Sequence, residues 1–442
     1  MGDRTFHGGV HPAEHKELSC KAPLVPYMPK GELVFLMNQH IGKPAAPIVQ
    51  KGDRVLAGQR IAEATGFVSA NIFSSISGTV KAIEPRPTAA GPMAQAIVIT
   101  PDGENTLAEG IGTQTNYLDL TNQEILDRIK AAGIVGMGGA GFPTHVKLTV
   151  KDPNKIRYVI ANGAECEPYI TCDDQLMQTH AEEIVTGIEI ILRLFPQAHG
   201  VVCIENNKPD AIAAMKAACE GRGRISVMPM KTKYPQGGER SLISVVASRH
   251  LKLGMLPADA GCVVDNVASI RAVYRAVCLN EPLMERGVTV SGDSVKNPGN
   301  FWVKIGTSSR ELVDACGGWN EGLEPEKILS GGPMMGIPLV NLDVPICKNN
   351  NAITALSVDP VSAAPMTACL RCGRCNRVCP LGLSPQLMQV AAQHKDYERY
   401  EKRLYGLECI ACGCCTYICP AKRPLMQLFK VTKAEIMATK KR

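Results

Sequence analysis

The sequence predicts a multidomain protein of mixed α/β class. Its 442 residues exceed what one ordinary hydrophobic core organises, so roughly two to four domains are expected. Patterns typical of strands and helices alternate between residues 116 and 284, which predicts a largely parallel sheet covered by helices. Near the C-terminus, two cysteine runs of equal spacing predict a small domain organised around bound metal.

The composition argues against a membrane-spanning protein and against a secreted disulfide scaffold. No apolar run reaches the roughly 18 to 20 residues that span a bilayer, and the polar start MGDRTFHGGV has no secretory apolar segment. The 18 cysteines are therefore expected to be reduced thiols. We expect a cytoplasmic protein, or one that docks on a membrane from its cytoplasmic side.

The formal net charge of +6 is concentrated near the cysteine runs, and the chain before Met366 is slightly acidic. A basic tail often indicates nucleic acid or a membrane surface. Here the basic side chains would instead offset the negative charge of thiolate-bound metal, so no nucleic-acid partner is expected. A solvated basic face and docking to acidic proteins are the alternatives. The residues concerned are Arg371, Arg374, Arg377, Lys422 and Arg423.

Residues 1–115 are predicted to form a β module. Short stretches such as KGDRVLAGQRIAEA and FSSISGTVKAIEP alternate apolar and polar residues between glycines and prolines. This pattern resembles the barrel-sandwich of biotinyl and lipoyl carriers. The stretch at the carrier tip, TGFVSAN, has no lysine, so a structural or docking module is expected in place of a swinging arm.

Residues 116–284 are predicted to form the α/β domain. Thr121 and Glu124 indicate a capping box for a helix that Gly133 closes. The stretches RYVIANG, GVVCIEN and ISVMPM indicate strands, and a helix is expected over 181–195. In residues 285–345, two strands flank the turn NPG and Ser309 begins a short helix, which resembles a β-grasp domain of the SLBB type. A Pro- and Ala-rich link, SVDPVSAAPM, follows.

Residues 360–442 carry the spacing C-x2-C-x2-C-x3-C-P twice, which is typical of ferredoxins with two [4Fe–4S] clusters. The fourth cysteine of each run ligates the other cluster. One cluster is therefore assigned to Cys369, Cys372, Cys375 and Cys419, and the other to Cys409, Cys412, Cys415 and Cys379. Zinc is disfavoured because this interlocked spacing is atypical for it. Cys414 is expected to be a spectator, and Ser384 is expected to cap a helix between the runs.

The stretch GIVGMGGAGFPTHVK contains a formal G-x-G-x-x-G, from Gly136 to Gly141. A helix precedes it, so it is no Rossmann fingerprint, but its backbone amides could approach an anionic or planar ligand. Lys147 could supply a cation for phosphate. Other polar residues could contact the same ligand, although each of them taken singly is more typical of a turn. These candidates are Asn162, Glu165, Glu167, Tyr234, Glu239 and Asn266.

Together, GMGGAGFPTHVK, NGAECEP, YPQGGERSL and DNVASI resemble the flavoprotein subunit of respiratory complex I. With the N-terminal module and the double cysteine motif, the whole chain resembles the RnfC family of Rnf-complex subunits; these complexes are membrane-associated NADH–ferredoxin oxidoreductases. The resemblance implies a Rossmann-like domain that binds FMN and NADH. Asp265 and Ala164 depart from the complex I pattern. The implied cofactor-binding residues are Gly136, Gly138, Gly139, Ala140, Phe142, Lys147, Asn162, Glu165, Glu167, Tyr234, Gly237, Gly238, Glu239 and Asn266.

The resemblance also implies the function. The chain is expected to be the NADH-oxidising, electron-input subunit of an ion-translocating complex, peripheral on the cytoplasmic face of the cell membrane. Glu167 and Glu239 would meet NADH as catalytic residues, and electrons would be exchanged with other subunits and ultimately with ferredoxin. One alternative is a cobalamin reductase-like protein of a diol-utilisation microcompartment, which lacks the N-terminal module. Another is an electron-transfer adaptor whose flavin site has decayed.

Overall fold

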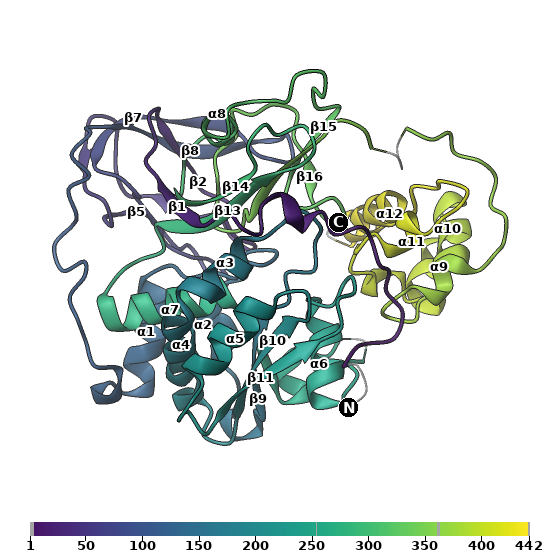
Figure 1. The fold of residues 1–442 in the computed structure, drawn as a ribbon, viewed down its shortest axis with the longest axis horizontal. Helices are drawn as coiled ribbons and strands as arrows, with labels where there is room; N and C mark the ends of the chain where they lie inside the picture. Colours follow the sequence, from purple (N-terminus) through teal and green to yellow (C-terminus); the bar gives the residue numbers. More distant parts are fainter. Residues whose placement is uncertain (1–3, 253, 360–362, 441–442) are drawn as a thin grey trace.

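The computed structural model describes residues 4–252, 254–359 and 363–440. Residues 360–362, within the predicted link, lie outside the described residues. Figure 1 shows an α/β layer below, two β modules above it, and a small helical domain at one side, in yellow. Within the described ranges, no helix combines the length and the apolar character needed to cross a membrane.

The N-terminal β module consists of two antiparallel sheets. Alternating apolar residues such as Phe35, Ile97 and Ile99 are fully buried between them, which explains why these short strands form. The stretch TGFVSAN joins two strands of the smaller sheet, as a hairpin tip should. The larger sheet has the order β2 (Leu33–Leu36), β8 (Met93–Pro101), β7 (Gly78–Pro87), β4 (Arg54–Val55), and the smaller one β3 (Ala46–Pro47), β5 (Arg60–Glu63), β6 (Ile72–Phe73).

The α/β domain is built on a four-stranded sheet whose strands are all parallel. Successive residues of its central strand are buried on opposite faces: Val159 and Ala161 pack into one apolar cluster and Ile160 into another. Burial on both faces explains the nearly continuous apolar runs of these strands. The order is β11 (Ile225–Met230), β10 (His199–Glu205), β9 (Tyr158–Gly163), β12 (Cys262–Asn266).

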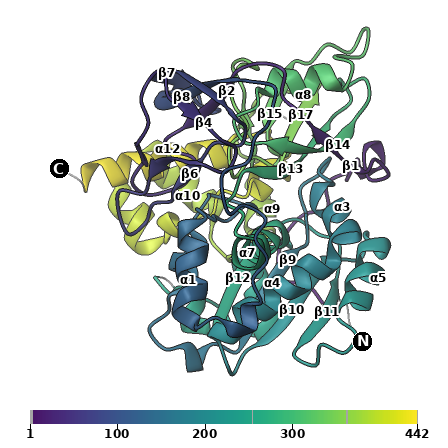
Figure 2. The ribbon, with the colours of Figure 1, turned by 90° about the vertical axis from the view of Figure 1, so that its left-hand side faces the viewer.

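Helices cover both faces of this sheet. Figure 2 shows α1 (Asn122–Ala131), α4 (Ala181–Leu194) and α7 (Val267–Leu279) gathered on one face, and these helices pack against one another. On the other face, α6 (Glu239–Ala247) contributes Leu242 and Ile243 to the core. The remaining helices are α2 (Thr144–Leu148), α3 (Cys172–Thr179) and α5 (Pro209–Ala218).

Local signals in the sequence account for several of these elements. The capping box is confirmed, since the Glu124 amide donates to Thr121 Oγ1 at 3.2 Å and the Thr121 amide donates to Glu124 Oε2 at 2.7 Å. Gly133 follows the helix with a φ of 65°, as predicted. The strand order places β10 and β12 on opposite sides of β9. This arrangement makes a switch point between β9 and β12, where open α/β sheets bind ligands at the carboxyl ends of the strands.

A six-stranded sheet crosses the predicted boundaries of the β-grasp region. It takes in β1, from the N-terminal segment, and β17, which lies beyond residue 345. The short helix α8 (Ser309–Ala315) begins at Ser309, as predicted, and the side chain of Ser308 caps it. The order is β1 (Leu24–Tyr27), β14 (Gly299–Lys304), β13 (Glu285–Ser291), β17 (Ala352–Leu356), β15 (Lys327–Ser330), β16 (Ile337–Pro338).

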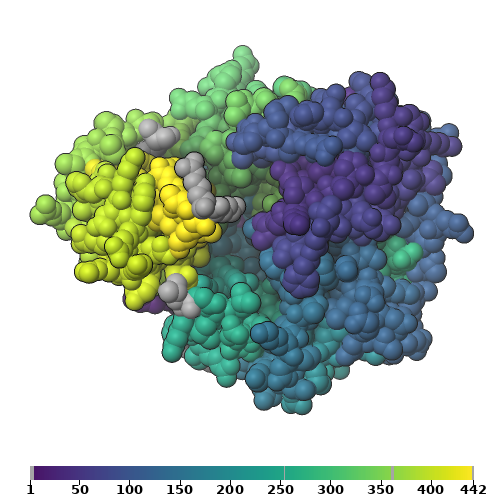
Figure 3. Space-filling view, turned by 180° about the vertical axis from the view of Figure 1, so that it is seen from behind, coloured from purple at the N-terminus to yellow at the C-terminus, as the bar shows by residue number. Residues whose placement is uncertain are grey.

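The C-terminal domain repeats one small unit. Each cysteine loop turns through a residue with positive φ, Arg371 at 54° and Ala411 at 52°, and runs into a single helical turn. Ser384 occupies the N-cap position of α10, but its side chain makes no capping hydrogen bond in the described structure. Figure 3 shows this domain as a lobe against the green and teal segments. Its helices are α9 (Arg374–Arg377), α10 (Pro385–Gln393), α11 (Cys414–Tyr417) and α12 (Leu425–Thr439), with a π-helical turn over Arg399–Arg403.

Gly187 allows α4 and α7 to approach closely, because a Cβ there would lie 2.3 Å from the carbonyl oxygen of Ile270. We predict that Gly187→Ala lowers the free energy of unfolding by about 1–3 kcal/mol, although alanine favours helix by about 1 kcal/mol. Denaturant unfolding measures the change, with Thr186→Ala on the same helix as control. A more stable Gly187→Ala would show that the helices are not in close contact.

Candidate functional site

Two asparagines stand at the switch point of the parallel sheet. Asn162 lies at the end of β9 and donates from Nδ2 to the Gly237 carbonyl at 2.9 Å. Asn266 lies at the end of β12, caps α7 by accepting from the Ala268 amide at 2.9 Å, and donates to Asp173 Oδ2 at 2.6 Å. The two strands bring these residues together from distant parts of the sequence, as the predicted site requires.

The first glycine loop lies over this edge of the sheet. A Cβ at Gly138 would lie 3.0 Å from Asn266 Nδ2, so the loop rests against this side chain and a larger residue would require one of the two to shift. The loop is closed by a hydrogen bond from the Gly136 amide to the Phe142 carbonyl at 2.8 Å. Gly139 and Ala140 are exposed beyond it, and Phe142 is half-buried. The exposed backbone can therefore approach a ligand at this edge of the sheet, here called the crevice because open α/β sheets bind ligands at such a position.

Lys147 and Asp265 form an ion pair beside this loop. Lys147 Nζ donates to Asp265 Oδ1 at 2.8 Å and to the Val264 carbonyl at 2.9 Å. Burial alone would lower the pKa of Lys147, but the Asp265 carboxylate outweighs this effect and raises it. Asp265 is buried, and its second oxygen, Oδ2, has no hydrogen-bond partner among the described residues. A buried acceptor without a partner is costly, and ligand hydroxyl groups would satisfy it.

The second glycine loop borders the same crevice. A Cβ at Gly237 would lie 3.3 Å from Asn162 Oδ1, so this loop also rests on the end of β9. Gly238 is the N-cap of α6 and Glu239 begins the helix. The Glu239 carboxylate contributes to the raised pKa of Lys147, which places these two charges near each other. The crevice thus gathers glycine amides, two amide side chains, one cation and two carboxylates, a set that fits the phosphate, ribityl and ring groups of FMN.

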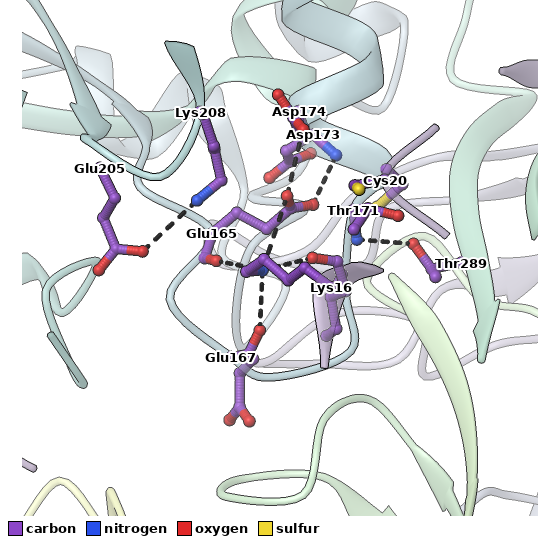
Figure 4. Close-up of polar contacts among 12 residues, drawn as sticks. Lys16, Cys20, Glu165, Glu167, Thr171, Asp173, Asp174, Glu205, Lys208 and Thr289 are labelled. Carbon is purple, nitrogen blue, oxygen red and sulfur yellow. Dashed lines mark hydrogen bonds and ion pairs between the residues drawn. The ribbon is translucent and has the colours of Figure 1, made fainter. Parts of the chain in front are cut away.

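Glu165 has a structural role in this arrangement. Its carboxylate accepts from the amides of Asp173 at 2.7 Å and Asp174 at 3.3 Å, and so satisfies the first turn of α3. Burial raises the pKa of this carboxyl to about 8. Figure 4 shows Glu165 beside the ammonium group of Lys16, with Lys208 and Glu205 to one side. A contact between Glu165 and a cofactor stays a prediction.

Glu167 and Tyr234 are also engaged by the protein itself. Glu167 accepts from the amides of Met334 at 3.0 Å and Met335 at 2.9 Å, and burial raises its pKa to about 7. The Tyr234 hydroxyl donates to the Cys412 carbonyl at 2.8 Å. Both side chains therefore lie where the α/β domain meets the β-grasp sheet and the cysteine domain. Their predicted contacts with NADH or FMN remain predictions.

Lys16, Lys208 and Glu205 are polar residues of this region that the sequence alone did not suggest. Lys208 Nζ donates to the Ala164 carbonyl at 2.7 Å and lies 3.4 Å from Glu205 Oε2, with both side chains buried. Lys16 Nζ donates to three carbonyl groups of the loop after β9, those of Glu165, Glu167 and Ile170. No motif marks these residues, because the carbonyl groups that accept from Lys16 and Lys208 are brought near only by the fold.

The cysteine domain contains two cavities, and four predicted ligands line each of them. The cavity nearer the α/β domain, here called the inner site, is lined by Cys379, Cys409, Cys412 and Cys415. The other cavity, the outer site, is lined by Cys369, Cys372, Cys375 and Cys419. The fourth cysteine of each run therefore reaches across to the other run. Four soft thiol donors around each cavity fit a [4Fe–4S] cluster.

The two sites differ in exposure. Cys412 and Cys415 of the inner site are buried, whereas Cys369 and Cys372 of the outer site are exposed. Cys414 also lines the inner cavity, and its thiol lies 3.9 Å from the Tyr234 carbonyl. Two contacts join the crevice domain to the inner site: the hydrogen bond from the Tyr234 hydroxyl to the Cys412 carbonyl, and the ion pair between Arg240 of α6 and Glu408, at 2.5 Å. The inner site is thus the one in contact with the crevice domain.

Comparison with known families confirms the predicted types and order of domains. An RnfC barrel-sandwich hybrid domain matches residues 4–104 and a Nuo51 FMN-binding domain matches 129–275. An SLBB domain matches 288–338 and a 4Fe–4S dicluster domain matches 365–420. A solved structure of an NAD+-reducing [NiFe]-hydrogenase is weakly similar, with 18% sequence identity and a TM-score of 0.49 over 73% of this chain and 62% of its own.

Several curated relatives, all RnfC subunits, align with nearly the whole chain. The one from the proton-translocating ferredoxin:NAD(+) oxidoreductase complex of Clostridium ljungdahlii is 44% identical over 99% of this chain and 95% of its own length. The one from the Na(+)-translocating complex of Acetobacterium woodii is 40% identical over 99% of this chain and 98% of its own length. The one from the ion-translocating oxidoreductase complex of Rhodobacter capsulatus is 42% identical over 98% of this chain and 83% of its own length. The chain therefore belongs to the RnfC family, a subunit of the ion-translocating ferredoxin:NAD(+) oxidoreductase complexes known as Rnf complexes.

Proposed function

We propose that this chain is the NADH-oxidising, electron-input subunit of an Rnf complex, in which electrons pass between NADH, FMN and two [4Fe–4S] clusters. The single observation that carries the proposal is the contact between the flavin-type crevice and the inner thiol site, through Tyr234 and Cys412. The names of the relatives support it, since they are ferredoxin:NAD(+) oxidoreductase subunits. The same names do not favour a cobalamin reductase-like function.

The crevice residues would hold FMN through complementary polar groups. The amides around Gly138 and Gly139 would approach the flavin, Asn162 and Asn266 would bind its ring or ribityl groups, and Lys147 would contribute positive charge toward the phosphate. The free oxygen of Asp265 would accept from a ribityl hydroxyl. When bound, FMN accepts a hydride and returns its two electrons one at a time. The protein orients this chemistry and excludes competing reactions.

NADH would enter on the open side of the crevice. Phe142, half-buried on the first glycine loop, and Glu239, exposed at the start of α6, would border the region that the flavin leaves free. Glu167 is the third residue in this role, and it would have to share its carboxylate with the amides of Met334 and Met335. These three residues would bind and orient the nicotinamide nucleotide.

Differences in exposure support an order of transfer. The inner site contacts the crevice domain, whereas the outer site presents exposed cysteines beside exposed Leu370 and Arg371. Electrons from NADH would therefore reach the inner site first and leave through the outer site to another subunit, and ultimately to ferredoxin. The protein would sit peripherally on the cytoplasmic face of the membrane, where NADH is available.

Asp265 provides a test of the flavin site. We predict that Asp265→Ala weakens FMN binding about tenfold or more, because the flavin loses an acceptor and Lys147 loses its partner, at roughly 1–3 kcal/mol for an unmet hydrogen bond. Fluorescence titration of the flavin-free protein with FMN measures this change. Asp127→Ala, on the exposed face of α1, is the control. Equal affinities for the two variants would place the flavin elsewhere.

Cysteine variants test the cross-over assignment and the order of transfer. We expect Cys379→Ala and Cys409→Ala to behave alike: each loses about four irons, and NADH no longer reduces the cluster that remains. Cys419→Ala and Cys369→Ala should also lose about four irons but keep a cluster that NADH reduces. Iron analysis and EPR after anaerobic addition of NADH measure both properties.

Cys414→Ala is the matched control for these variants and should retain both clusters. The assignment would be wrong if Cys379→Ala behaved like Cys369→Ala, because each run would then bind its own cluster.

A further inference from the structure

The N-terminal segment from Phe6 to Ser19, here called the strap, contacts both the inner thiol site and the crevice domain. Figure 1 shows this purple segment running between the C-terminal domain and the α/β domain before it reaches β1. We propose that the strap is a positioning device that fixes the flavin crevice relative to the inner cluster. The inference rests on the proposed function of these two sites.

One end of the strap is held against a predicted cluster ligand. The Gly9 amide donates to the Val378 carbonyl at 2.9 Å. A Cβ at Gly8 would lie 2.8 Å from the carbonyl oxygen of Cys379, and a Cβ at Gly9 would lie 2.6 Å from that of Tyr234. Both glycines have a φ of 80°, a conformation that other residues rarely adopt. Glycine is therefore needed here both for the backbone turn and for close contact.

The middle of the strap pairs with the second glycine loop. Val10 and Tyr234 exchange two backbone hydrogen bonds, of 2.8 and 2.9 Å. The Tyr234 hydroxyl in turn donates to the Cys412 carbonyl, 2.8 Å away. The strap and Tyr234 thus connect the backbones of two ligands of the inner site, Cys379 and Cys412, to the loop that borders the crevice.

The far end of the strap holds the loop that follows β9. Lys16 Nζ donates to the carbonyl groups of Glu165, Glu167 and Ile170 at 2.9, 3.1 and 2.5 Å, and its side chain is buried with Glu165 (Figure 4). The Tyr169 amide donates to the Glu14 carbonyl at 2.8 Å. An ammonium group withdrawn from water must keep these partners, so displacement of the strap would also displace the loop.

Transfer between the two sites should be more sensitive to the strap than either site alone. Electron transfer slows steeply as donor and acceptor separate, and small displacements of reacting groups have large effects on rate. The strap supplies no predicted cluster ligand and no residue of the crevice. Loosening its Gly8–Gly9 end should therefore slow the passage of electrons from flavin to inner cluster. Flavin reduction by NADH should be unchanged, because Lys16 at the other end still holds the loop that carries Glu167.

The test compares Gly8→Ala and Gly9→Ala with Gly103→Ala. Gly103 has the same φ of 80° but no atom within 4 Å of an added Cβ, so it isolates the effect of the strap contacts from backbone strain. Full-length protein is purified anaerobically, and FMN and iron are quantified. The flavin is reduced either by NADH or by a photoreduced deazaflavin, and cluster reduction is followed by rapid-freeze EPR.

We expect both strap variants to slow flavin-to-cluster transfer about tenfold or more, with flavin reduction by NADH and cofactor content as in Gly103→Ala. Rates equal to those of Gly103→Ala would overturn the inference. If only the deazaflavin reduces wild-type flavin and the strap effect persists, the proposed NADH oxidation fails and the strap inference stands.

If the glycine variants lose cofactor, the same transfer rate is measured in a milder strap variant, Lys233→Met, and in its control, Lys216→Met. Lys233 Nζ donates to the Phe6 carbonyl at 2.8 Å and lies 4.5 Å from the centre of the Phe6 ring, so Lys233→Met loosens the start of the strap. It should slow the same step about threefold. Lys216→Met, on the exposed side of α5, is its control, and equal rates for these two variants would again overturn the inference.

Discussion

The hydrogen bond from the Tyr234 hydroxyl to the Cys412 carbonyl is the contact on which the arrangement of this protein depends. Tyr234 is almost fully buried and lies among Val10, Met334 and Cys414, so its phenol group needs the polar partner that the ligand loop provides. The bond uses the backbone of Cys412 and leaves its thiol available to metal. One side chain thus joins the crevice domain to the inner thiol site without competing for the cluster.

Buried charges explain why the loop after β9 needs external support. Lys16, Lys208, Glu165 and Glu205 all lie out of water, where an ionisable group without partners is costly. Each of them is compensated by carbonyl groups, amides or an opposite charge. Such a network contributes little net stability, but it favours the observed loop conformation, because displacement of the loop would leave buried ionisable groups without partners. The energetic cost of burying these groups thus favours a defined geometry next to the crevice.

Much of the fold could be predicted from local patterns. Thr121 and Glu124 form their capping box, the parallel strands follow the apolar runs, and the cysteine spacing predicts two cavities that are each lined by four predicted ligands. Non-local contacts could not be predicted. Nothing in the stretch LVPY shows that β1 joins the β-grasp sheet, and no motif marks Lys16 as the partner of carbonyl groups about 150 residues away. The sequence also does not show that the carboxylates of Glu165 and Glu167 accept from backbone amides, because these contacts depend on tertiary packing.

The central claim is that NADH, a flavin, the inner cluster and the outer cluster form one sequence of electron transfer within this chain. Rapid-freeze EPR of the anaerobically purified protein, mixed with NADH, tests it most directly, with the spectrum of Cys419→Ala identifying the inner cluster. The account predicts that the flavin is reduced first, and that the inner-cluster signal then rises before the signal of the outer cluster. Bound flavin that NADH leaves oxidised, or an outer cluster that is reduced before the inner one, would contradict it.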